Sequence, residues 1–371
     1  MSEPAAAGHP AGIPSARSAA PASGDDPRGP LTRSRERDVL DLEPPDEVEA
    51  RGTPGRSPVL AQAASRFWFS SRAIQRALAC LWLLDGLLQL QPALFGPGFA
   101  YNLNYNDVMS QPPGLAHLLV GVVARVAPHL LVWNALFAAT QLLIGLGLLF
   151  RRTVRWAILT SLAWAIIVWV FGEGLGGLFT GLATIVGGAP GPVLLYPLIG
   201  FIAWPPRGDA GSPGRWRRSG GATAALLARG SWGLIWVGGA FLQLQPSYPY
   251  PAVLASTFSM NLMGNEPGPL VALDTFLTRT AIQLGPPLVL GLGLAEAAVG
   301  MAVMLRFQLR TFLGIGAFLA VLFWIGGQNF GGILTGDATD PGSGPLLVLL
   351  ALTLLPAALQ SVQQPGKKHP G

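Results

Sequence analysis

The chain has 371 residues, of which 50% are hydrophobic and only 12% are charged. With long apolar runs and a mean hydropathy of +0.45, this composition is typical of an integral membrane protein and does not indicate a nucleic-acid-binding surface. The single cysteine excludes a disulfide framework within the chain.

Residues 1–70 are predicted to form a disordered, cytoplasmic N-terminal tail. This segment is rich in Ala, Pro, Gly and Ser, and residues 1–50 hold ten of the nineteen acidic residues. Such a composition does not supply enough apolar surface to bury in a core. The segment lacks a basic start followed by an apolar core and a cleavage site, so no cleavable signal peptide is predicted. A short partner-docking segment at residues 39–49 is the alternative.

A first membrane repeat is predicted at residues 71–206. Its apolar runs predict four membrane spans, at residues 73–92, 129–150, 154–171 and 190–204. Residues 115–127 are apolar but short, which indicates an interfacial helix or the start of the second span.

A basic cytoplasmic linker, residues 207–228, separates this repeat from a second one at residues 229–361, and residues 362–371 form a C-terminal tail. The second repeat again contains four predicted spans, at residues 229–246, 285–305, 311–326 and 344–360. The segment between its first two spans is predicted to be a loop that carries Asn261, Asn265 and Glu266.

An internal duplication is indicated by two glycine-rich stretches, W-V-F-G-E-G-L-G-G-L-F-T-G at 169–181 and W-I-G-G-Q-N-F-G-G-I-L-T-G at 324–336. The motif L-Q-L-Q-P also occurs twice, at 88–92 and 242–246. Glycine at such spacing lets backbone groups approach closely. The stretches are either tightly packed re-entrant turns or a small-molecule or ion site built from both copies.

The arginines predict how the repeats are oriented. They cluster before the first span, between the second and third spans of each repeat, and in the linker. These positions share one side only if each repeat has four spans, and that side is expected to be cytoplasmic. An even number of spans makes the repeats parallel. Both termini are then cytoplasmic, and both glycine-rich loops face outward.

Ionisable residues inside predicted spans are the first candidates for a binding site, because their burial in lipid is costly. Asp85 lies in the first span and Glu296 in the sixth. Arg125 and Arg279 occur at matching places in the two copies and are plausible partners for these carboxyl groups. Paired groups that only fix helix packing are the alternative to a proton or substrate site.

The outer loops supply the other candidates, namely Glu173 in the first copy and Asn329, Asp337 and Asp340 in the second. Carboxylate and amide oxygens suit a hard cation, but their spacing matches no calcium-loop pattern. The acids are distributed unequally between the copies, which favours one composite site over two equal ones. Sequence drift is the other explanation.

The glutamines of the L-Q-L-Q-P motifs lie two residues apart and therefore point to different faces of a helix. We interpret at least one glutamine in each copy as a hydrogen-bonding brace for a neighbouring loop.

Each half resembles the DoxX/DoxD-like (MauE/DoxX-type) four-helix membrane proteins. The resemblance is carried by a four-span unit, by a first helix with a glycine and a polar end, Asp85-Gly86 through Gln91-Pro92, and by the glycine-rich outer loop. It covers residues 73–204 and 229–360. It implies a bacterial inner-membrane protein that serves an outer-face redox partner or a quinone.

The fold prediction is therefore an all-α membrane protein with eight transmembrane helices in two parallel repeats. The functional hypothesis is an accessory or redox-linked membrane subunit with an outward-facing site, and the alternatives are a small-solute transporter and a structural scaffold. Expected partners are the bilayer and a membrane or periplasmic protein, but no nucleic acid. No motif names a catalytic residue or a metal site, and quinone is the one cofactor suggested.

Overall fold

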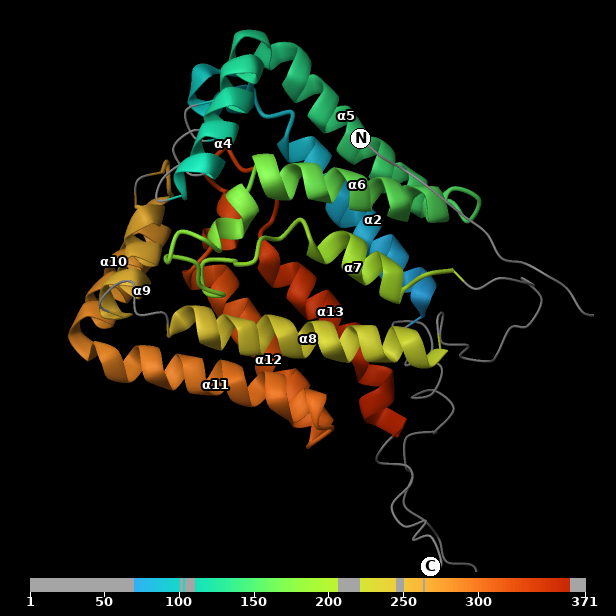
Figure 1. The fold of residues 1–371 in the computed structure, drawn as a ribbon, viewed down its shortest axis with the longest axis vertical. Helices are drawn as coiled ribbons and strands as arrows, with labels where there is room; N and C mark the ends of the chain where they lie inside the picture. The colour runs from blue at the N-terminus through green and yellow to red at the C-terminus, as the bar shows by residue number, and fades with distance from the viewer. Residues whose placement is uncertain are drawn as a thin grey trace, which may run out of the picture. The chain divides into compact units, whose positions relative to one another are not determined.

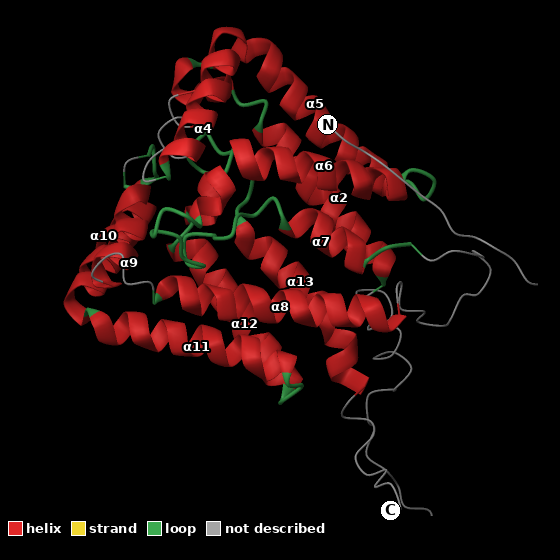
Figure 2. Cartoon of the chain, in the orientation of Figure 1, coloured by secondary structure: helices red, strands yellow, loops and turns green. Residues whose placement is uncertain are grey.

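A computed structural model describes residues 70–100, 103, 111–205, 221–244, 250–262 and 264–360. All of these residues belong to one compact unit, Arg56–Gly371. Every regular element in these ranges is a helix, and loops join the helices (Figure 2). The predicted C-terminal tail, most of the linker and nearly all of the N-terminal tail lie outside the described residues.

The first half of the chain contributes five α-helices and three short 3-10 turns to this unit. In chain order they are α2 (Ser71–Leu88), η1 (Pro92–Phe95), α4 (Pro113–Val126), η2 (Ala127–His129), α5 (Leu130–Leu149), α6 (Val154–Phe171), η3 (Gly174–Gly177) and α7 (Leu195–Ile202).

The second half contributes α8 (Gly221–Gln243), α9 (Tyr250–Asn261), α10 (Gly268–Leu284), α11 (Pro286–Met304), α12 (Leu309–Gly326), η4 (Asn329–Gly332) and α13 (Ser343–Gln360). Figure 1 shows α8 and α11 running side by side in this half, with α12 and α13 next to them.

Small residues allow the long helices to pack closely. In the first half α2 packs along α5, where Gly86 faces Leu142 and Gly145 faces Leu83. In the second half α8 packs along α11 in the same manner, with Gly300 against Val237. Backbones approach closely at such positions because glycine has no side chain, which is a common device in membrane helix pairs.

Five helical segments in the described part of the chain are long and apolar enough to cross a bilayer. Such a set indicates a multi-pass membrane protein. The segments are Pro113–Leu149, Val154–Phe171, Thr223–Gln243, Pro286–Met304 and Leu309–Gly326.

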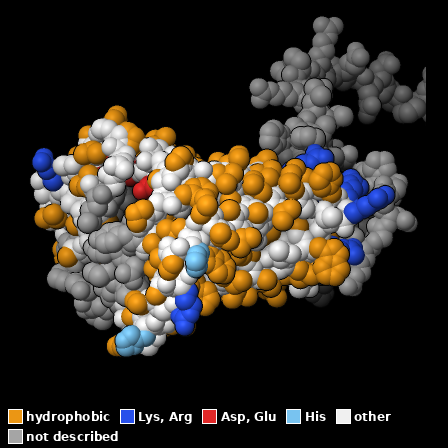
Figure 3. Space-filling view, turned by 90° about the horizontal axis from the view of Figure 1, so that it is seen from above, with side chains coloured by type: hydrophobic (Ala, Val, Ile, Leu, Met, Phe, Trp, Pro, Cys, Tyr) orange, Lys and Arg blue, Asp and Glu red, His pale blue; other side chains and the backbone are white. Residues whose placement is uncertain are grey.

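The outer surface of these helices agrees with contact to lipid. Figure 3 shows hydrophobic side chains over much of the face in view, with most of the basic side chains at one end. Large apolar side chains point outward, among them Trp156 on α6 and Leu234 and Phe241 on α8, each at least 73% exposed. At the start of α2, the Arg72 guanidinium donates hydrogen bonds to the Leu148 and Leu149 carbonyls, the last of α5.

Three sequence predictions differ from the structure. The predicted fourth span, residues 190–204, contains only the eight-residue helix α7, which is too short to cross a bilayer alone. Prolines at 190 and 192 interrupt a longer helix there, because they lack the backbone N–H that a helix requires. The predicted loop at Asn261 is largely the helix α9, and α8 begins within the predicted linker, at Gly221.

Candidate functional site

The two glycine-rich stretches adopt the same backbone conformation at positions 155 residues apart. Leu175 and Gly176 are left-handed, with φ of 58° and 64°, and Phe330 and Gly331 are left-handed with φ of 59° and 71°. A Cβ atom at Gly176 would collide with the Pro190 carbonyl. Glycine at this place is therefore required both by the positive φ and by the close approach of another backbone segment.

Matching hydrogen bonds hold each loop to the segment that follows it. The Trp169 indole donates to the Pro190 carbonyl at 2.7 Å, and the Trp324 indole donates to the Pro341 carbonyl at 2.6 Å. In addition, the side chain of Glu173 accepts from the Val193 N–H at 3.1 Å. Gln328, 155 residues later than Glu173, accepts in the same way from the Ser343 N–H at 2.8 Å.

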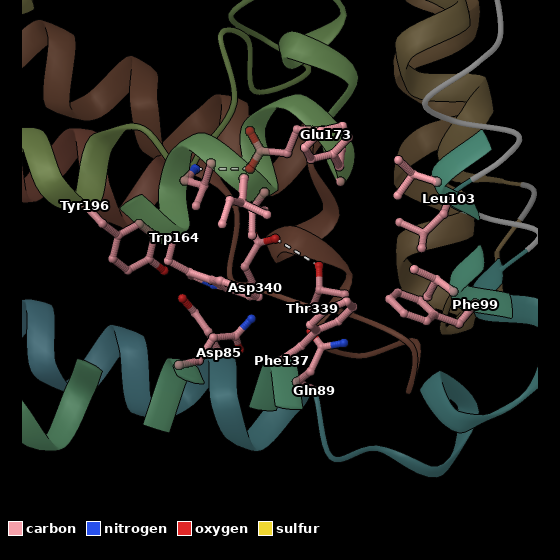
Figure 4. Close-up of a pocket in the computed structure, with 18 of the residues that line it drawn as sticks. Asp85, Gln89, Phe99, Leu103, Phe137, Trp164, Glu173, Tyr196, Thr339 and Asp340 are labelled. Carbon is pink, nitrogen blue, oxygen red and sulfur yellow. Dashed lines mark hydrogen bonds between the residues drawn. The ribbon is translucent and has the colours of Figure 1, made fainter. Parts of the chain in front are cut away.

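A cavity of about 140 Å³ lies beside the first glycine-rich loop (Figure 4). Its volume is close to that of an engineered protein cavity that binds benzene, so it has room for one small ring or a few water molecules. Residues of both halves line it, because Thr339 and Asp340 reach it from the second glycine-rich loop. Its other polar lining residues are Asp85, Gln89, Gln141, Glu173 and Tyr196.

Asp85 and Tyr196 point toward each other at one side of this cavity (Figure 4). Both residues are 2% exposed. Neither Asp85 Oδ1 nor the Tyr196 hydroxyl has a hydrogen-bond partner within the described residues. The Tyr196 ring also contacts the Trp82 ring, with centroids 4.4 Å apart. The Asp85 and Tyr196 side chains nevertheless lie close enough to interact with each other, so a molecule that bound to both would replace that interaction.

Asp340 brings a carboxyl group of the second half into the same cavity. Its two oxygens accept hydrogen bonds from the Gly342 N–H at 2.8 Å and from the Thr339 hydroxyl at 3.0 Å. Burial raises the pKa of Asp340 above its ordinary value, and these two hydrogen bonds partly oppose the rise. Asp340 and Glu173 are both close enough to Asp85 for their charges to interact.

The glutamines of the first L-Q-L-Q-P motif brace their surroundings, as the sequence predicts. The Gln91 amide donates to the Ala338 carbonyl of the second glycine-rich loop at 3.2 Å, which ties the two halves together. Gln89 is buried and exchanges hydrogen bonds with Asn134 on α5. In the second copy Gln243 is buried without a partner in the described residues, and Gln245 lies outside them.

In the second half, different residues occupy the positions that correspond to the cavity lining and to the loop beside it. Asn329, which stands where the first copy has Gly174, donates to Asp274 on α10 at 2.7 Å. Asn261 on α9 donates to the other oxygen of Asp274 at 3.2 Å. Gly239, which stands where the first copy has Asp85, packs against the Ile185 side chain.

The predicted site residues therefore separate into groups. Asp85, Glu173 and Asp340 meet at the cavity, whereas Asn329 joins the buried network around Asp274. Asp337 accepts a hydrogen bond from Thr335 within its own loop.

The arginines and Glu296 lie away from the cavity lining. Arg125 is exposed and donates to the Gly121 carbonyl of its own helix at 2.6 Å, and Arg279 is exposed on α10. Within the described residues the predicted pairing of these arginines with Asp85 or Glu296 is not found, since both arginines are exposed and both carboxyl groups are buried. Glu296 is fully buried in α11, and neither of its carboxylate oxygens has a described partner.

Sequence reasoning missed Tyr196, Trp164 and Thr339 at the cavity and Asp274 in the second half. An isolated tyrosine in the apolar stretch before Trp204 was the available signal for Tyr196. Asp274 was also an isolated acid in an otherwise apolar helix, which is the pattern that singled out Asp85.

Comparisons with protein-family models, with curated proteins and with solved structures found no match to this chain. Among the described residues, no group of three His, Cys, Asp or Glu side chains is placed to hold a metal ion. Inferences about function therefore depend on the cavity and on the chemistry of its lining.

Proposed function

We propose that this chain is a small-solute transporter of the membrane, whose substrate binds in the cavity beside Asp85. The observation that carries the proposal is a cavity lined by both halves, in which buried polar atoms have no described partner. Substrate sites between two repeats, near buried ionisable groups, are a common arrangement in secondary transporters.

The residues that line the cavity also indicate which kind of molecule would fit it. One part of the cavity is polar, and the rest is formed by apolar side chains that include Val123 on α4, Phe137 on α5 and Ile167 on α6. Ile167 is 48% exposed on the outer surface of the helices. A compact molecule with a polar head and an apolar side suits such a lining.

The architecture that we propose for this function is a tandem duplication with parallel halves and four membrane segments in each half. In the first half, the short helix α7 and the loop before it together form the fourth segment of this proposal. The matched loop conformations and the matched tryptophan hydrogen bonds support it. The basic end, near Arg72 and Arg151, is cytoplasmic in this proposal, together with both chain termini. The cavity then opens toward the outer face of a bacterial inner membrane.

The proposal is tested with purified protein and a small set of probes. The probes are tetramethylammonium, tert-butanol of similar size, and a short-chain quinone. We expect at least one of them to raise the thermal unfolding temperature, and the variant Val123→Phe, which fills the cavity, to abolish this rise. Leu143→Phe on the exposed face of α5 is the matched control.

Transport is then measured as uptake of the binding probe, or of its radiolabelled form, into proteoliposomes. A probe that binds in the cavity without crossing the membrane contradicts transport. If no probe binds, or if Val123→Phe binds all of them as the wild type does, the cavity is not a ligand site.

A redox-linked accessory subunit, related to the DoxX/DoxD-like proteins, is the second candidate. The observation that favours it is a cavity with aromatic walls that holds the Trp164 indole, a hydrogen-bond donor without a described partner, and the Tyr196 hydroxyl, whose neighbour is Asp85. Such donors suit the carbonyl oxygens of a quinone ring. Binding of the short-chain quinone alone, without uptake of any probe, supports this candidate.

A further inference from the structure

The carboxyl groups at the cavity are not balanced by basic residues. Asp85, Glu173 and Asp340 line it, but none of its described lining residues is Lys, Arg or His. Several carboxylates that share a poorly solvated site cannot all remain charged without compensation. Within the described lining, protons or a bound cation are therefore the available sources of positive charge.

Basic residues on the neighbouring helices lie outside the cavity lining. On α2, Arg72 donates to the Leu148 carbonyl near the end of α5, and Arg76 is exposed. α5 and α7 contain no Asp, Glu, Lys, Arg or His, and on α6 the only such residue is Arg155, at its first turn. On α4, Arg125 and His117 are both exposed. Asp107, in the segment before α4, lies outside the described residues.

The second half shows that the charge of Glu173 is not needed to build the loop. Glu173 accepts a hydrogen bond from the Val193 N–H, and the neutral Gln328 accepts the equivalent bond from the Ser343 N–H. An amide oxygen therefore suffices for this brace. Asp85 likewise has a glycine, Gly239, at the equivalent position. Two of the three acids are thus additions to a scaffold that forms without them.

The walls of the cavity indicate which kind of cation fits. The acids are not arranged as a metal-binding group in the described residues. Instead, aromatic side chains surround the space, including those of Trp82, Phe137 and Trp164. Aromatic faces attract organic ammonium groups, and this attraction is strongest where water is excluded. The volume of about 140 Å³ admits an alkylammonium ion of few atoms.

We propose that the cavity binds a small organic monocation in exchange for one proton from the carboxyl groups of Asp85, Glu173 and Asp340. This inference rests on the proposed function, because it names the class of molecule that the transporter carries. When the cation binds, one carboxyl group releases its proton to solvent, so the charge of the site is unchanged. The proton returns when the cation leaves on the other side.

The test uses tetramethylammonium as the cation and tert-butanol as its neutral counterpart, with the purified full-length chain. We expect tetramethylammonium to bind and tert-butanol not to bind. Proton release in weakly buffered solution should approach one per cation. The affinity should rise about tenfold for each pH unit in the range where the carboxyl group is protonated.

The variant Glu173→Gln copies the residue that the second half already has at this position. We expect it to keep the wild-type unfolding temperature and to weaken tetramethylammonium binding about tenfold or more. Asp85→Asn is the second variant and should reduce both the affinity and the proton release. Gln328→Asn, in the second loop, is the control for a change in brace length without a change in charge.

The outcomes separate the inference from the proposed function. If tert-butanol or the quinone binds and Val123→Phe abolishes that binding, while tetramethylammonium does not bind, the cavity is a ligand site but the cation inference is wrong. Binding of tetramethylammonium without proton release, or unchanged in both Glu173→Gln and Asp85→Asn, also overturns it. Failure of all three probes overturns the inference and the proposed function together.

Discussion

The two glycine-rich loops have the same backbone but different interiors. Both contain a left-handed pair, Leu175-Gly176 in the first and Phe330-Gly331 in the second, and both are held by a tryptophan indole. Beside the first loop lies a cavity, whereas beside the second loop Asn329 and Asp274 form a buried hydrogen-bonded pair.

This difference distinguishes the residues that stabilise the fold from the residues that form the candidate site. Features that occur in both halves, such as the braces of Glu173 and Gln328, are explained by the packing of the loop. Features of one half alone, such as Asp85 and Tyr196, are not needed for that packing. Comparison of the two halves thus supplies a control for several residues of the proposed site, among them Asp85 and Glu173.

The largest expected effect comes from the glycines that both halves share. Gly176→Ala and Gly331→Ala each impose a left-handed alanine, which costs about 1–2 kcal/mol, and each adds a collision with a neighbouring backbone segment. We expect both variants to lose monodisperse folded protein in size-exclusion chromatography. Gly314→Ala on α12, where a Cβ atom meets nothing within 4 Å, should behave as the wild type. Tolerance of one loop variant alone would show that the loops are not equivalent.

A smaller effect, confined to the second half, is expected for Asp274→Ala. The change leaves the amides of Asn329 and Asn261 without their acceptor, and a buried network broken in this way typically costs about 2–4 kcal/mol. Thermal or denaturant unfolding measures the loss, with the neighbouring Thr275→Ala as the control. Ligand binding by the folded fraction should be unchanged. A loss of binding would place Asp274 within the site.

The pH dependence of stability should come in part from Asp340. Its pKa is raised above the ordinary value of 3.8, so the folded protein holds this proton more tightly than the unfolded chain does. The stability that this proton confers is complete below the unfolded pKa and is lost as the pH rises through the folded pKa. We expect Asp340→Asn to reduce the fall in unfolding temperature as the pH rises above about 4. An unchanged slope would show that Asp340 does not contribute.

The smallest effect on stability is expected for Glu173→Gln. The amide oxygen keeps the hydrogen bond from the Val193 N–H, so the unfolding free energy should change by less than about 1 kcal/mol. Glu173→Ala, which removes the acceptor, should be clearly less stable in the same unfolding experiment. Equal losses in the two variants would mean that the negative charge itself holds the loop.

Much of the helical framework could be predicted from the sequence, because apolar runs and basic turns mark it directly. Helices α5, α6, α11 and α12 begin and end within a few residues of the predicted spans. The eight-residue α7 and the helix α9 could not be placed by this reasoning. The length of α7 depends on the backbone geometry around Pro190. Helix α9 has a mixed composition and is stabilised by packing against α10 and α11.

The site could be predicted only in part. Asp85, Glu173 and Asp340 were recognised as unusual by their position in apolar or glycine-rich sequence, but their meeting depends on how the two loops pack. Arg125 and Arg279 occupy matching positions in the two halves, whereas these acids have no acidic counterpart, yet both arginines are exposed. Residues that occur in both halves support the fold, whereas the acidic residues that line the cavity occur in one half only.

The central claim is that a small molecule can enter the cavity that Gln141 lines in the first half, and cysteine accessibility tests it most directly. In a Cys80→Ser background, Gln141→Cys and Glu296→Cys place a thiol at equivalent buried positions on α5 and α11. We expect the small reagent methyl methanethiosulfonate to modify the thiol at position 141, which lines the cavity, and not the one at position 296. Equal modification of both thiols, or of neither, would contradict the account.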